Sequence, residues 1–304
     1  MLKKAAVVYC SPAGSTRRVA QFIVNELEAG GTFVLSADLG EDDDSSVVQS
    51  VIKEVEKGEI CLFIGSPVYV NRPLPPVMAF ISSLPENAGV CAVPFVTWGG
   101  VSSGIALYDM GKALMEKGCT LVGAAKVLAV HSIMWQWENP LGEGHPDEGD
   151  ERLVRELAVE VSKRTAKGRR EAISLSDLAY QSEEAHAEME QMTLEKAKEH
   201  MPRIEMIEER CTRCGVCEEI CPVQAITLSP YPELGEKCFY CFQCMRICPE
   251  KAIAADLTLV AERIRRRAKA FDERPLTKIW ISRSTVKETG SREREGNQDL
   301  ESRC

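Results

Sequence analysis

The sequence predicts an α/β protein that begins with a doubly wound parallel sheet and ends with a small α+β unit. In residues 1–165, short apolar segments alternate with amphipathic ones, which is typical of a parallel sheet covered by helices on both faces. In residues 201–256, two runs of four cysteines share one spacing. The chain has 304 residues, which is enough for one full-size domain and one small domain.

Five strands and five helices can be assigned in the first domain. The strands are the apolar segments 4–10, 32–36, 60–65, 91–97 and 120–130. The helices are the amphipathic segments 15–28, 45–57, 75–83, 103–117 and 149–164. Because strands and helices alternate strictly, we expect a five-stranded parallel sheet in the order 2-1-3-4-5.

The rest of the chain is expected to divide into three parts. Residues 166–200 are polar and rich in glutamate, but spaced apolar residues such as Leu178 and Met189 predict a helical connector that packs on the domains. Residues 201–256 form the cysteine-rich unit. In the carboxyl-terminal part, 257–304, a helix is predicted from 257 to about 271, and polarity and charge predict disorder for 285–304.

Eight cysteines in two matched runs are the strongest signal in the sequence. The runs are Cys211, Cys214, Cys217 and Cys221, followed by Pro222, and Cys238, Cys241, Cys244 and Cys248, followed by Pro249. Each cysteine of the second run lies 27 residues after its counterpart, and Ala225 and Ala252 also match. A pair of zinc sites would leave the third cysteine of each run and the Cys-Pro pair unexplained. A disulfide framework is disfavoured because nothing in the sequence marks the protein for export.

The spacing Cys-x2-Cys-x2-Cys-x3-Cys-Pro resembles that of bacterial two-cluster ferredoxins. In those proteins, three thiolates of one run and the fourth of the other hold each [4Fe-4S] cluster. The resemblance implies two clusters with crossed ligands. The first cluster would be held by Cys211, Cys214, Cys217 and Cys248, and the second by Cys238, Cys241, Cys244 and Cys221.

A ligand site is expected outside the carboxyl ends of the parallel strands, where the strand order reverses. Three loops lie there. The first contains Ser11, Pro12, Ala13, Gly14, Ser15 and Thr16, the second contains Pro67, Val68, Tyr69, Val70 and Asn71, and the third contains Thr97, Trp98, Gly99, Gly100 and Gly104. The first runs into a helix, where hydroxyls and free amides suit a phosphate. In the third, Trp98 is expected to form a flat wall beside a ring, and the glycines allow close approach of the backbone.

These loops resemble the FMN-binding loops of flavodoxins. Ser11, Gly14 and Thr16 stand at matching positions of the phosphate loop, whereas Ala13 replaces a residue that usually carries a hydroxyl. Residues 1–256 as a whole resemble the flavodoxin-ferredoxin fusion proteins of anaerobic bacteria and archaea. The resemblance implies FMN, two [4Fe-4S] clusters and electron transfer. The alternative is a doubly wound domain with an empty or differently occupied crevice, such as a receiver-like module.

The loop that follows the fifth strand holds further candidates. His131 could donate a proton to a reduced flavin or to a substrate, but a hydrogen-bonded histidine at a strand end is the favoured interpretation. Asp147, Asp150 and Glu151 are explained as capping and dipole-matched charges. No Gly-x-Gly-x-x-Gly follows a strand, so no dinucleotide site is predicted.

The charge distribution excludes some partners. The net charge is -9, but residues 257–304 hold 12 Lys and Arg against 8 Asp and Glu, a net of +4. The basic run from Arg263 to Lys269 could dock on an acidic partner or on phosphate, and a solvated helix face is the favoured interpretation. The run has no interleaved aromatic residues, so nucleic acid is not expected. The sequence shows no membrane span or signal peptide, and the 13 cysteines are expected to stay reduced in the cytoplasm.

The leading hypothesis is an iron-sulfur flavoprotein oxidoreductase. Single electrons would pass between a redox carrier protein and FMN through the two clusters, and FMN would reduce or oxidise a small-molecule substrate. The alternatives are a pure electron carrier without a substrate site and a redox-sensing docking module. An enzyme is expected to have a cavity beside the flavin, walled by Tyr69, Trp98 and the loop of Trp135, whereas a carrier presents only the flavin edge.

Overall fold

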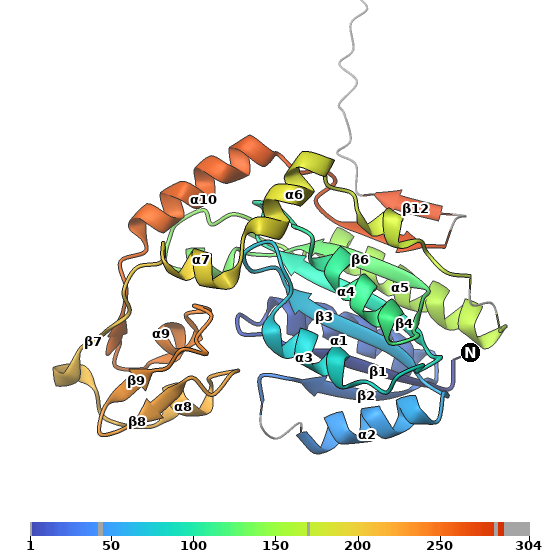
Figure 1. Cartoon of the computed structure of the whole chain (residues 1–304), viewed down its shortest axis with the longest axis horizontal. Helices are drawn as coiled ribbons and strands as arrows, with labels where there is room; N and C mark the ends of the chain where they lie inside the picture. The colour runs from blue at the N-terminus through green and yellow to red at the C-terminus, as the bar shows by residue number, and fades with distance from the viewer. Residues whose placement is uncertain (1, 42–44, 169–170, 283–284, 289–304) are drawn as a thin grey trace, which may run out of the picture.

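The computed structural model describes residues 2–41, 45–168, 171–282 and 285–288, and a single twisted sheet forms the centre of its larger part (Figure 1). Within these residues the sheet has eight strands in the order β12-β11-β6-β4-β3-β1-β2, and the short β5 pairs with β4. The strands are β1 Lys4–Tyr9, β2 Phe33–Asp38, β3 Cys61–Pro67, β4 Cys91–Trp98, β5 Thr120–Leu121, β6 Gly123–Leu128, β11 Lys278–Ile281 and β12 Thr285–Glu288.

The five central strands confirm the predicted parallel order 2-1-3-4-5. β1 pairs in parallel with both β2 and β3, and β4 pairs in parallel with both β3 and β6. The expected fifth strand, 120–130, is divided into β5 and β6, with Val122 between them, and both parts pair in parallel with β4. The carboxyl ends of β1, β3, β4 and β6 therefore meet at one edge of the sheet, which is where the three loops begin.

Helices cover both faces of the sheet and enclose a separate core on each. The helices are α1 Ser15–Ala29, α2 Ser45–Glu56, α3 Pro75–Ser83, α4 Ala106–Glu116 and α5 Glu148–Ala166. Ala6 and Val8 of β1 pack in the core of α2, α3 and α4, whereas Ala5 and Val7 pack in the core of α1 and α5. This alternation follows from the two-residue repeat of a strand, and it explains why β1 is apolar throughout.

The expected caps of α5 are present. The Asp147 carboxylate accepts hydrogen bonds from the amides of Gly149 and Asp150, and the Asp150 carboxylate accepts one from the amide of Asp147. Glu148, Asp150 and Glu151 stand in the first turn, and Lys163 and Arg164 stand in the last, so both ends complement the helix dipole. Among the described residues, no helix is both long enough and apolar enough to cross a membrane.

The chain leaves this domain after α5 and forms a connector and the small cysteine-rich unit, residues 201–256, whose strands and helices lie within 205–254. The connector contains α6 Glu183–Gln191 and α7 Leu194–Lys198, together with a 3-10 turn at Leu175–Leu178. The unit contains β7 Glu205–Met206, α8 Val216–Glu219, β8 Ile226–Leu228, β9 Pro232–Leu234, α9 Gln243–Ile247 and β10 Ile253–Ala254. β7 pairs with β10 and β8 with β9, both antiparallel. The unit lies beside the carboxyl edge of the sheet (Figure 1).

The carboxyl-terminal part differs from the expectation. After α10, Thr258–Phe271, the chain returns to the sheet, where β11 pairs antiparallel with β6 and β12 pairs antiparallel with β11. Residues 285–288, which were expected to be disordered, therefore form β12, and residues 289–304 lie outside the described part. The cause is burial in β11: Ile279 and Ile281 enter one core and Trp280 enters the other.

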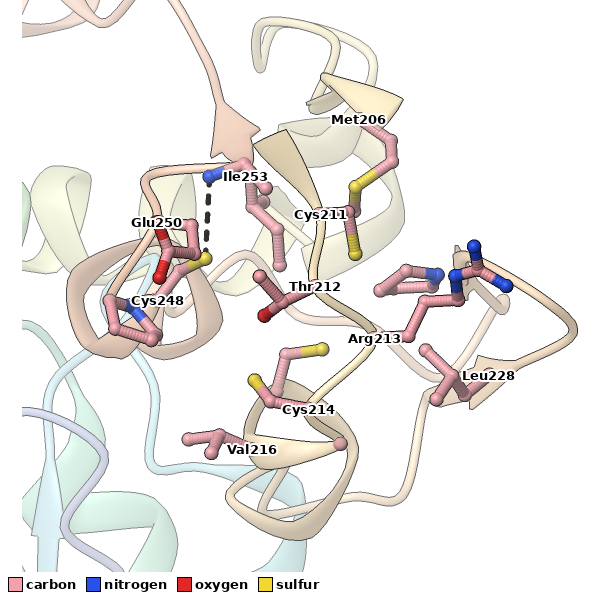
Figure 2. A pocket seen from close by; sticks show the side chains of 15 residues that line it. Met206, Cys211, Thr212, Arg213, Cys214, Val216, Leu228, Cys248, Glu250 and Ile253 are labelled. Carbon is pink, nitrogen blue, oxygen red and sulfur yellow. Dashed lines mark hydrogen bonds between the residues drawn. The ribbon is translucent and has the colours of Figure 1, made fainter. Parts of the chain in front are cut away.

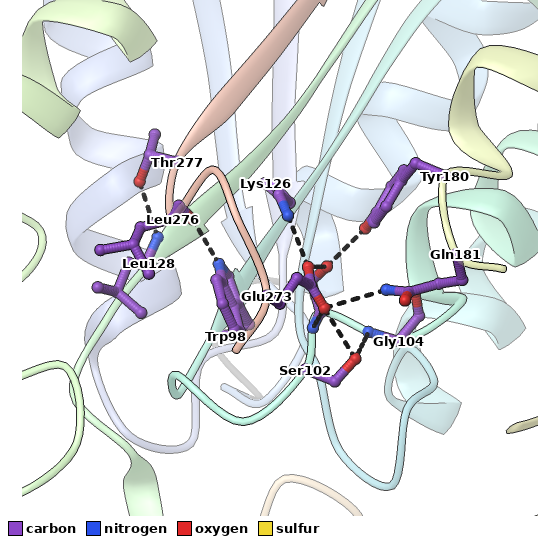
Figure 3. A network of polar contacts seen from close by, with 11 residues as sticks. Trp98, Ser102, Gly104, Lys126, Leu128, Tyr180, Gln181, Glu273, Leu276 and Thr277 are labelled. Carbon is purple, nitrogen blue, oxygen red and sulfur yellow. Dashed lines mark hydrogen bonds and ion pairs between the residues drawn. The ribbon is translucent and has the colours of Figure 1, made fainter. Parts of the chain in front are cut away.

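A buried ion pair holds this return in place (Figure 3). Lys126 of β6 is 1% exposed, and its Nζ lies 2.6 Å from the Glu273 carboxylate, which follows α10. The same carboxylate accepts hydrogen bonds from the Ser102 hydroxyl (2.9 Å), the Ser103 amide (2.9 Å) and the Gln181 side-chain amide (3.0 Å). Because every neighbour is a donor, the desolvation cost of burying the carboxylate is offset. The pair thus ties α10 to the third strand-end loop.

The substitution Glu273→Gln tests this pair. It keeps the shape of the side chain but leaves a buried ammonium without its carboxylate, so we expect a loss of about 3 kcal/mol in the free energy of unfolding. Thermal unfolding should show this as a fall of roughly 6 to 12 °C in melting temperature. The control is Glu86→Gln, because Glu86 pairs with Lys117 at the surface and its loss should hardly change the melting temperature.

The pH dependence of the free energy of unfolding gives a second test of the Lys126–Glu273 pair. Burial raises the pKa of Glu273, but the Lys126 ammonium and the surrounding donors outweigh it, so the pKa lies below its usual value. A lowered folded-state pKa stabilises the protein above the unfolded-state pKa of about 4.3, and this contribution is lost as the pH falls. The difference in the free energy of unfolding between wild type and Glu273→Gln should shrink below about pH 4. A difference that stays constant with pH would contradict the role of the ionised Glu273 carboxylate.

Candidate functional site

The eight cysteines form two groups of four, and each group takes its fourth member from the other run. Cys211, Cys214, Cys217 and Cys248 line one cavity (Figure 2). The pairing of β7 with β10 explains this, because it sets Met206 beside Ile253 and so brings the start of the first run next to the end of the second. We call these four residues the outer quartet.

The remaining four cysteines, Cys221, Cys238, Cys241 and Cys244, form the inner quartet. Burial, together with the neighbouring thiols of Cys241, Cys238 and Cys221, raises the pKa of the Cys244 thiol to about 12. Burial raises the pKa of Cys241 to about 12 as well. Thiols in such surroundings ionise only when a cation compensates the charge, as a bound metal does.

Backbone amides point at several of these sulfurs. The amide of Ala225 donates to Cys221 Sγ at 3.2 Å, and the amide of Ala252 donates to Cys248 Sγ at 3.3 Å. Ala225 and Ala252 are the matched positions of the sequence repeat, so the repeat preserves one local geometry. The amide of Tyr240 also donates to Cys238 Sγ, at 3.4 Å. Hydrogen bonds of this kind orient thiolate ligands and stabilise their negative charge.

At the carboxyl edge of the sheet, the three loops surround two adjoining cavities. The loop cavity, of about 40 Å³, is lined by Ala13, Ser15, Thr16, Pro67, Val68, Tyr69, Thr97, Trp98, Gly99, Ala129, Val130, His131 and Ser132. Gly14 precedes α1 with a φ of 88°, a conformation that favours glycine, and it has no side chain to cap the helix. In the first turn of α1, only the Arg17 amide is seen to donate to a side chain, the Ser11 hydroxyl, among the described residues. The Thr16 and Thr97 hydroxyls are hydrogen-bonded at 2.8 Å. This end of α1 therefore offers backbone amides to an anion in the cavity.

Three members of the first loop line neither cavity. The Ser11 hydroxyl accepts a hydrogen bond from the Arg17 amide at 2.9 Å, and the Ser11 amide donates to the Asp38 carboxylate at 3.2 Å. The Pro12 carbonyl accepts a hydrogen bond from Arg246 of α9. Ser11, Pro12 and Gly14 thus shape the loop, while Ala13, Ser15 and Thr16 face the loop cavity.

The second cavity is larger, about 280 Å³, and lies between the sheet, the connector, the cysteine-rich unit and α10. We call it the roofed cavity. It is lined by Val68, Tyr69, Val70, Asn71, Gly99, Val101, Ser102, His131, Ser132, Ile133, Met192, Ala197, His200, Met201, Tyr240, Val260, Arg263, Ile264 and Arg267. Tyr69 and Gly99 line both cavities, so the two are neighbours.

Tyr69 is the central side chain of the site. Its hydroxyl is buried and forms no hydrogen bond of normal geometry with the described residues, although the Ser132 side chain lies close to it. A polar atom of a ligand would satisfy this hydroxyl. Burial raises the pKa of Tyr69, and the nearby Cys241 thiol adds to this. Its ring packs edge-on against Phe239 of the cysteine-rich unit, with 5.9 Å between ring centroids.

Gly100 and Gly104 of the third loop line neither cavity. The Trp98 side chain is covered by a segment that the sequence analysis did not place there. Gly104 lies against the second loop, where a Cβ atom would stand 2.2 Å from the Asn71 carbonyl oxygen, and Gly100 has a φ of 78°. The Trp98 side chain is 2% exposed, and its Nε1 donates to the Leu276 carbonyl at 2.8 Å (Figure 3). The returning chain therefore covers most of the Trp98 indole, and Trp98 lines the loop cavity but not the roofed cavity.

Two further expectations for the following loop are settled by packing. Trp135 packs on Phe242 of the cysteine-rich unit, with ring centroids 6.4 Å apart, and does not line the roofed cavity. His131 Nδ1 accepts a hydrogen bond from the Ile133 amide at 3.3 Å, which agrees with the interpretation as a strand-end histidine. Burial lowers the pKa of His131 to about 4, so the ring is neutral at neutral pH.

The connector and α10 supply residues of the site that the sequence analysis did not select. Met192 and Met201 come from the connector and its end, and Arg263 and Arg267 come from α10. The spacing of Val260, Arg263, Ile264 and Arg267 puts them on one helix face, and this pattern is visible in the sequence. The sequence pattern does not show which surface this helix face covers.

Arg246 joins the cysteine-rich unit to the sheet edge. Its guanidinium donates to the Pro12 carbonyl at 2.5 Å and to the Ser132 carbonyl at 3.2 Å, and it lies 5.5 Å from the centre of the Trp135 ring. One side chain of α9 thus contacts two of the loops that begin at strand ends. The inner quartet is thereby held against the site.

Comparisons with known proteins agree with this description. Residues 204–227 match the family model of the 4Fe-4S binding domain. The cysteine-rich unit therefore contains a 4Fe-4S binding domain. The strand order of the sheet is that of the flavodoxin-like fold. The chain therefore joins a flavodoxin-like domain to a 4Fe-4S domain of the ferredoxin type.

Solved structures with some similarity cover about half of this chain. A flavodoxin from the domain Archaea is 22% identical, with 54% of this chain and 99% of that chain covered and a TM-score of 0.41. Flavodoxin 2 from Bacillus cereus is 18% identical, with 53% and 99% covered and a TM-score of 0.40. Rubredoxin oxygen:oxidoreductase from Desulfovibrio gigas is 17% identical, with 55% and 38% covered and a TM-score of 0.41. No curated protein sequence matches the chain.

The variant Arg246→Gln tests how the two domains are joined. It removes two charge-assisted hydrogen bonds, so amide hydrogen exchange in the loops at 11–14 and 131–135 should become faster by at least about tenfold. Arg203→Gln is the control, because Arg203 is an exposed arginine at the start of the 4Fe-4S domain. Unchanged protection of both loops in Arg246→Gln would refute the role of Arg246.

Proposed function

We propose that the protein is an iron-sulfur flavoprotein that passes single electrons between two [4Fe-4S] clusters and an FMN. One observation carries the proposal: the segment between two inner-quartet cysteines contacts the candidate flavin site. In the run Cys238-Phe239-Tyr240-Cys241, Phe239 packs on Tyr69 and Tyr240 lines the roofed cavity. A cluster on the inner quartet and a flavin at Tyr69 would be neighbours, which is the requirement for electron transfer between them.

The residues of the strand-end loops fit FMN. The start of α1 at the loop cavity, where Gly14 has no capping side chain, suits the phosphate, and the wall of the adjoining roofed cavity that Val68, Tyr69 and Gly99 form suits the ring system. The unpartnered Tyr69 hydroxyl lies where a polar atom of the flavin would satisfy it. Bound FMN would supply the step between two-electron chemistry with a substrate and one-electron exchange with the clusters. Val68, Tyr69 and Gly99 would orient it, and α10 would limit access of water.

The cysteine groups fit one cluster each. Four thiols surround a cavity in the outer quartet, and the crossed membership agrees with the ligation implied by the sequence spacing. Cys214 of the outer quartet is exposed, whereas the inner quartet faces the flavodoxin-like domain. We infer the order external carrier, outer cluster, inner cluster, flavin. The external carrier would be a one-electron redox protein, and cluster thiolates would need a reducing compartment such as the cytoplasm.

The roofed cavity supports an enzyme over a pure electron carrier. A carrier needs only an accessible flavin edge, whereas here a cavity of about 280 Å³ lies beside the candidate flavin site and is covered by α10 and the connector. A small-molecule substrate that meets the flavin would occupy this space. The walls differ from the expected ones, since Tyr69 and the start of the 131–138 loop contribute but the Trp98 and Trp135 side chains do not.

Pairs of cysteine substitutions test the two clusters and their crossed ligands. Wild-type protein purified without oxygen should contain about eight irons per chain, and Cys248→Ala should contain about half of that. Adding Cys214→Ala to Cys248→Ala should cause little further loss, because both residues serve one cluster. Adding Cys241→Ala should remove nearly all the iron.

Iron analysis with electron paramagnetic resonance checks these counts. Cys119→Ala is the control, because it removes a buried thiol that belongs to neither quartet. If Cys214→Ala with Cys248→Ala abolished both clusters while Cys241→Ala with Cys248→Ala spared one, the crossed assignment would be wrong.

The variant Ser15→Asp tests the phosphate site. A carboxylate in the first turn of α1 favours the helix but repels a phosphate bound at the same amides, so FMN affinity should fall at least about tenfold. Titration followed by flavin fluorescence measures this, with iron content as the check on folding. Ser45→Asp places the same charge at the start of α2 and should leave FMN binding unchanged. Full FMN affinity in Ser15→Asp would argue against this site.

A further inference from the structure

The roofed cavity has two unlike walls. One wall is made of the strand-end loops, with Val68, Tyr69 and Gly99, where the proposed function places the flavin ring. The opposite wall is made by the connector and by the inner face of α10, with Val260, Arg263, Ile264 and Arg267. A molecule between the walls would lie against the flavin on one side and against α10 on the other.

The wall formed by α10 is positively charged. Arg263 and Arg267 stand one helical turn apart, and both line the cavity. Arg263 Nη2 donates to the His200 carbonyl at 3.4 Å, and the Arg267 guanidinium lies 5.5 Å from the centre of the Phe271 ring. Within the described part of the chain, neither forms an ion pair with a carboxylate, and none of the described lining residues is Asp or Glu. Two guanidinium groups thus face the cavity in a protein with a net charge of -9.

The rest of the cavity is mostly apolar. Val101, Ile133, Met192 and Met201 line it together with the aromatic ring of Tyr240. Such a surface favours a compact apolar body, and the methionines adapt to its shape. His131 adds no positive charge at neutral pH, because burial keeps the ring neutral. The arginine side chains that line the cavity, Arg263 and Arg267, therefore carry its permanent positive charge.

We propose that the roofed cavity binds a small organic anion, with its carboxylate or phosphate group on Arg263 and Arg267 and its apolar body against the candidate flavin ring. Guanidinium groups bind both anions through paired hydrogen bonds, which is the shared chemistry of the two possibilities. The inference rests on the proposed function only for the position of the flavin. It assigns the inner arginines of α10 to substrate binding, whereas Arg266 and Lys269 are exposed on its outer side.

Calorimetric titration of the cofactor-loaded protein tests this binding, with benzoate, phenyl phosphate and neutral benzamide as probes. We expect saturable binding of benzoate, phenyl phosphate or both, and at least about tenfold weaker binding of benzamide. The double variant R263Q/R267Q should weaken anion binding at least about tenfold and leave iron and FMN content unchanged. The control R266Q/K269Q removes the same charge from the outer side and should bind as wild type does. Whichever anion binds better identifies the anionic group.

Three results would overturn the proposal. They are the absence of binding by both anions, equal binding of benzamide, and equal weakening by R263Q/R267Q and R266Q/K269Q. Flavin absorbance recorded in the same titration separates this proposal from the proposed function. Loss of FMN from wild type would refute the flavin assignment, while the calorimetric comparison of the two double variants would still decide the anion site. FMN retained without anion binding would refute only the anion site.

Discussion

Arg246 donates to carbonyl oxygens in two strand-end loops while Phe239 packs on Tyr69, and these contacts hold the inner quartet against the edge where a flavin would lie. The two carbonyl groups would otherwise need water, and the aromatic contact excludes it. Separate domains on a flexible tether would meet only occasionally. Here the relative position of inner quartet and flavin site is set by direct contacts, so the clusters and the flavin would form one continuous route.

The return of the chain to the sheet after α10 holds this helix over the roofed cavity. Lys126 and Glu273 attract each other inside the protein, and hydroxyl and amide donors surround the carboxylate. Alone, a buried charge at either position would be strongly destabilising. Together they bind the segment after α10 to β6, while Ser102 and Ser103 bind the same carboxylate to the 102–104 loop. This link explains why α10 covers the roofed cavity and does not extend into solvent. It also explains the burial of Trp98, since the Leu276 carbonyl takes its indole N–H.

The two sides of α10 have different roles in this arrangement. Its inner side closes a cavity beside the candidate flavin site and brings two guanidinium groups to it, while its outer side carries exposed basic residues. A cavity with a charged wall is useful for selecting a molecule, and an electron carrier has no need of one. Exposed Cys214 lies at the other end of the proposed route, where an external carrier would exchange electrons. In the proposed function, the place of electron exchange with the carrier would thus be separate from the place of substrate binding.

By itself, the sequence determined the five parallel strands, their order, the caps of α5 and the eight cysteines, because hydrophobic periodicity, capping and ligand spacing are local properties. Tertiary structure alone decided that residues 278–281 add an antiparallel strand, that Trp98 is covered, and that Arg263 and Arg267 face a cavity. Each of these depends on contacts between segments far apart in the chain. A short apolar segment or an amphipathic helix shows that one face is buried, but only packing shows what buries it.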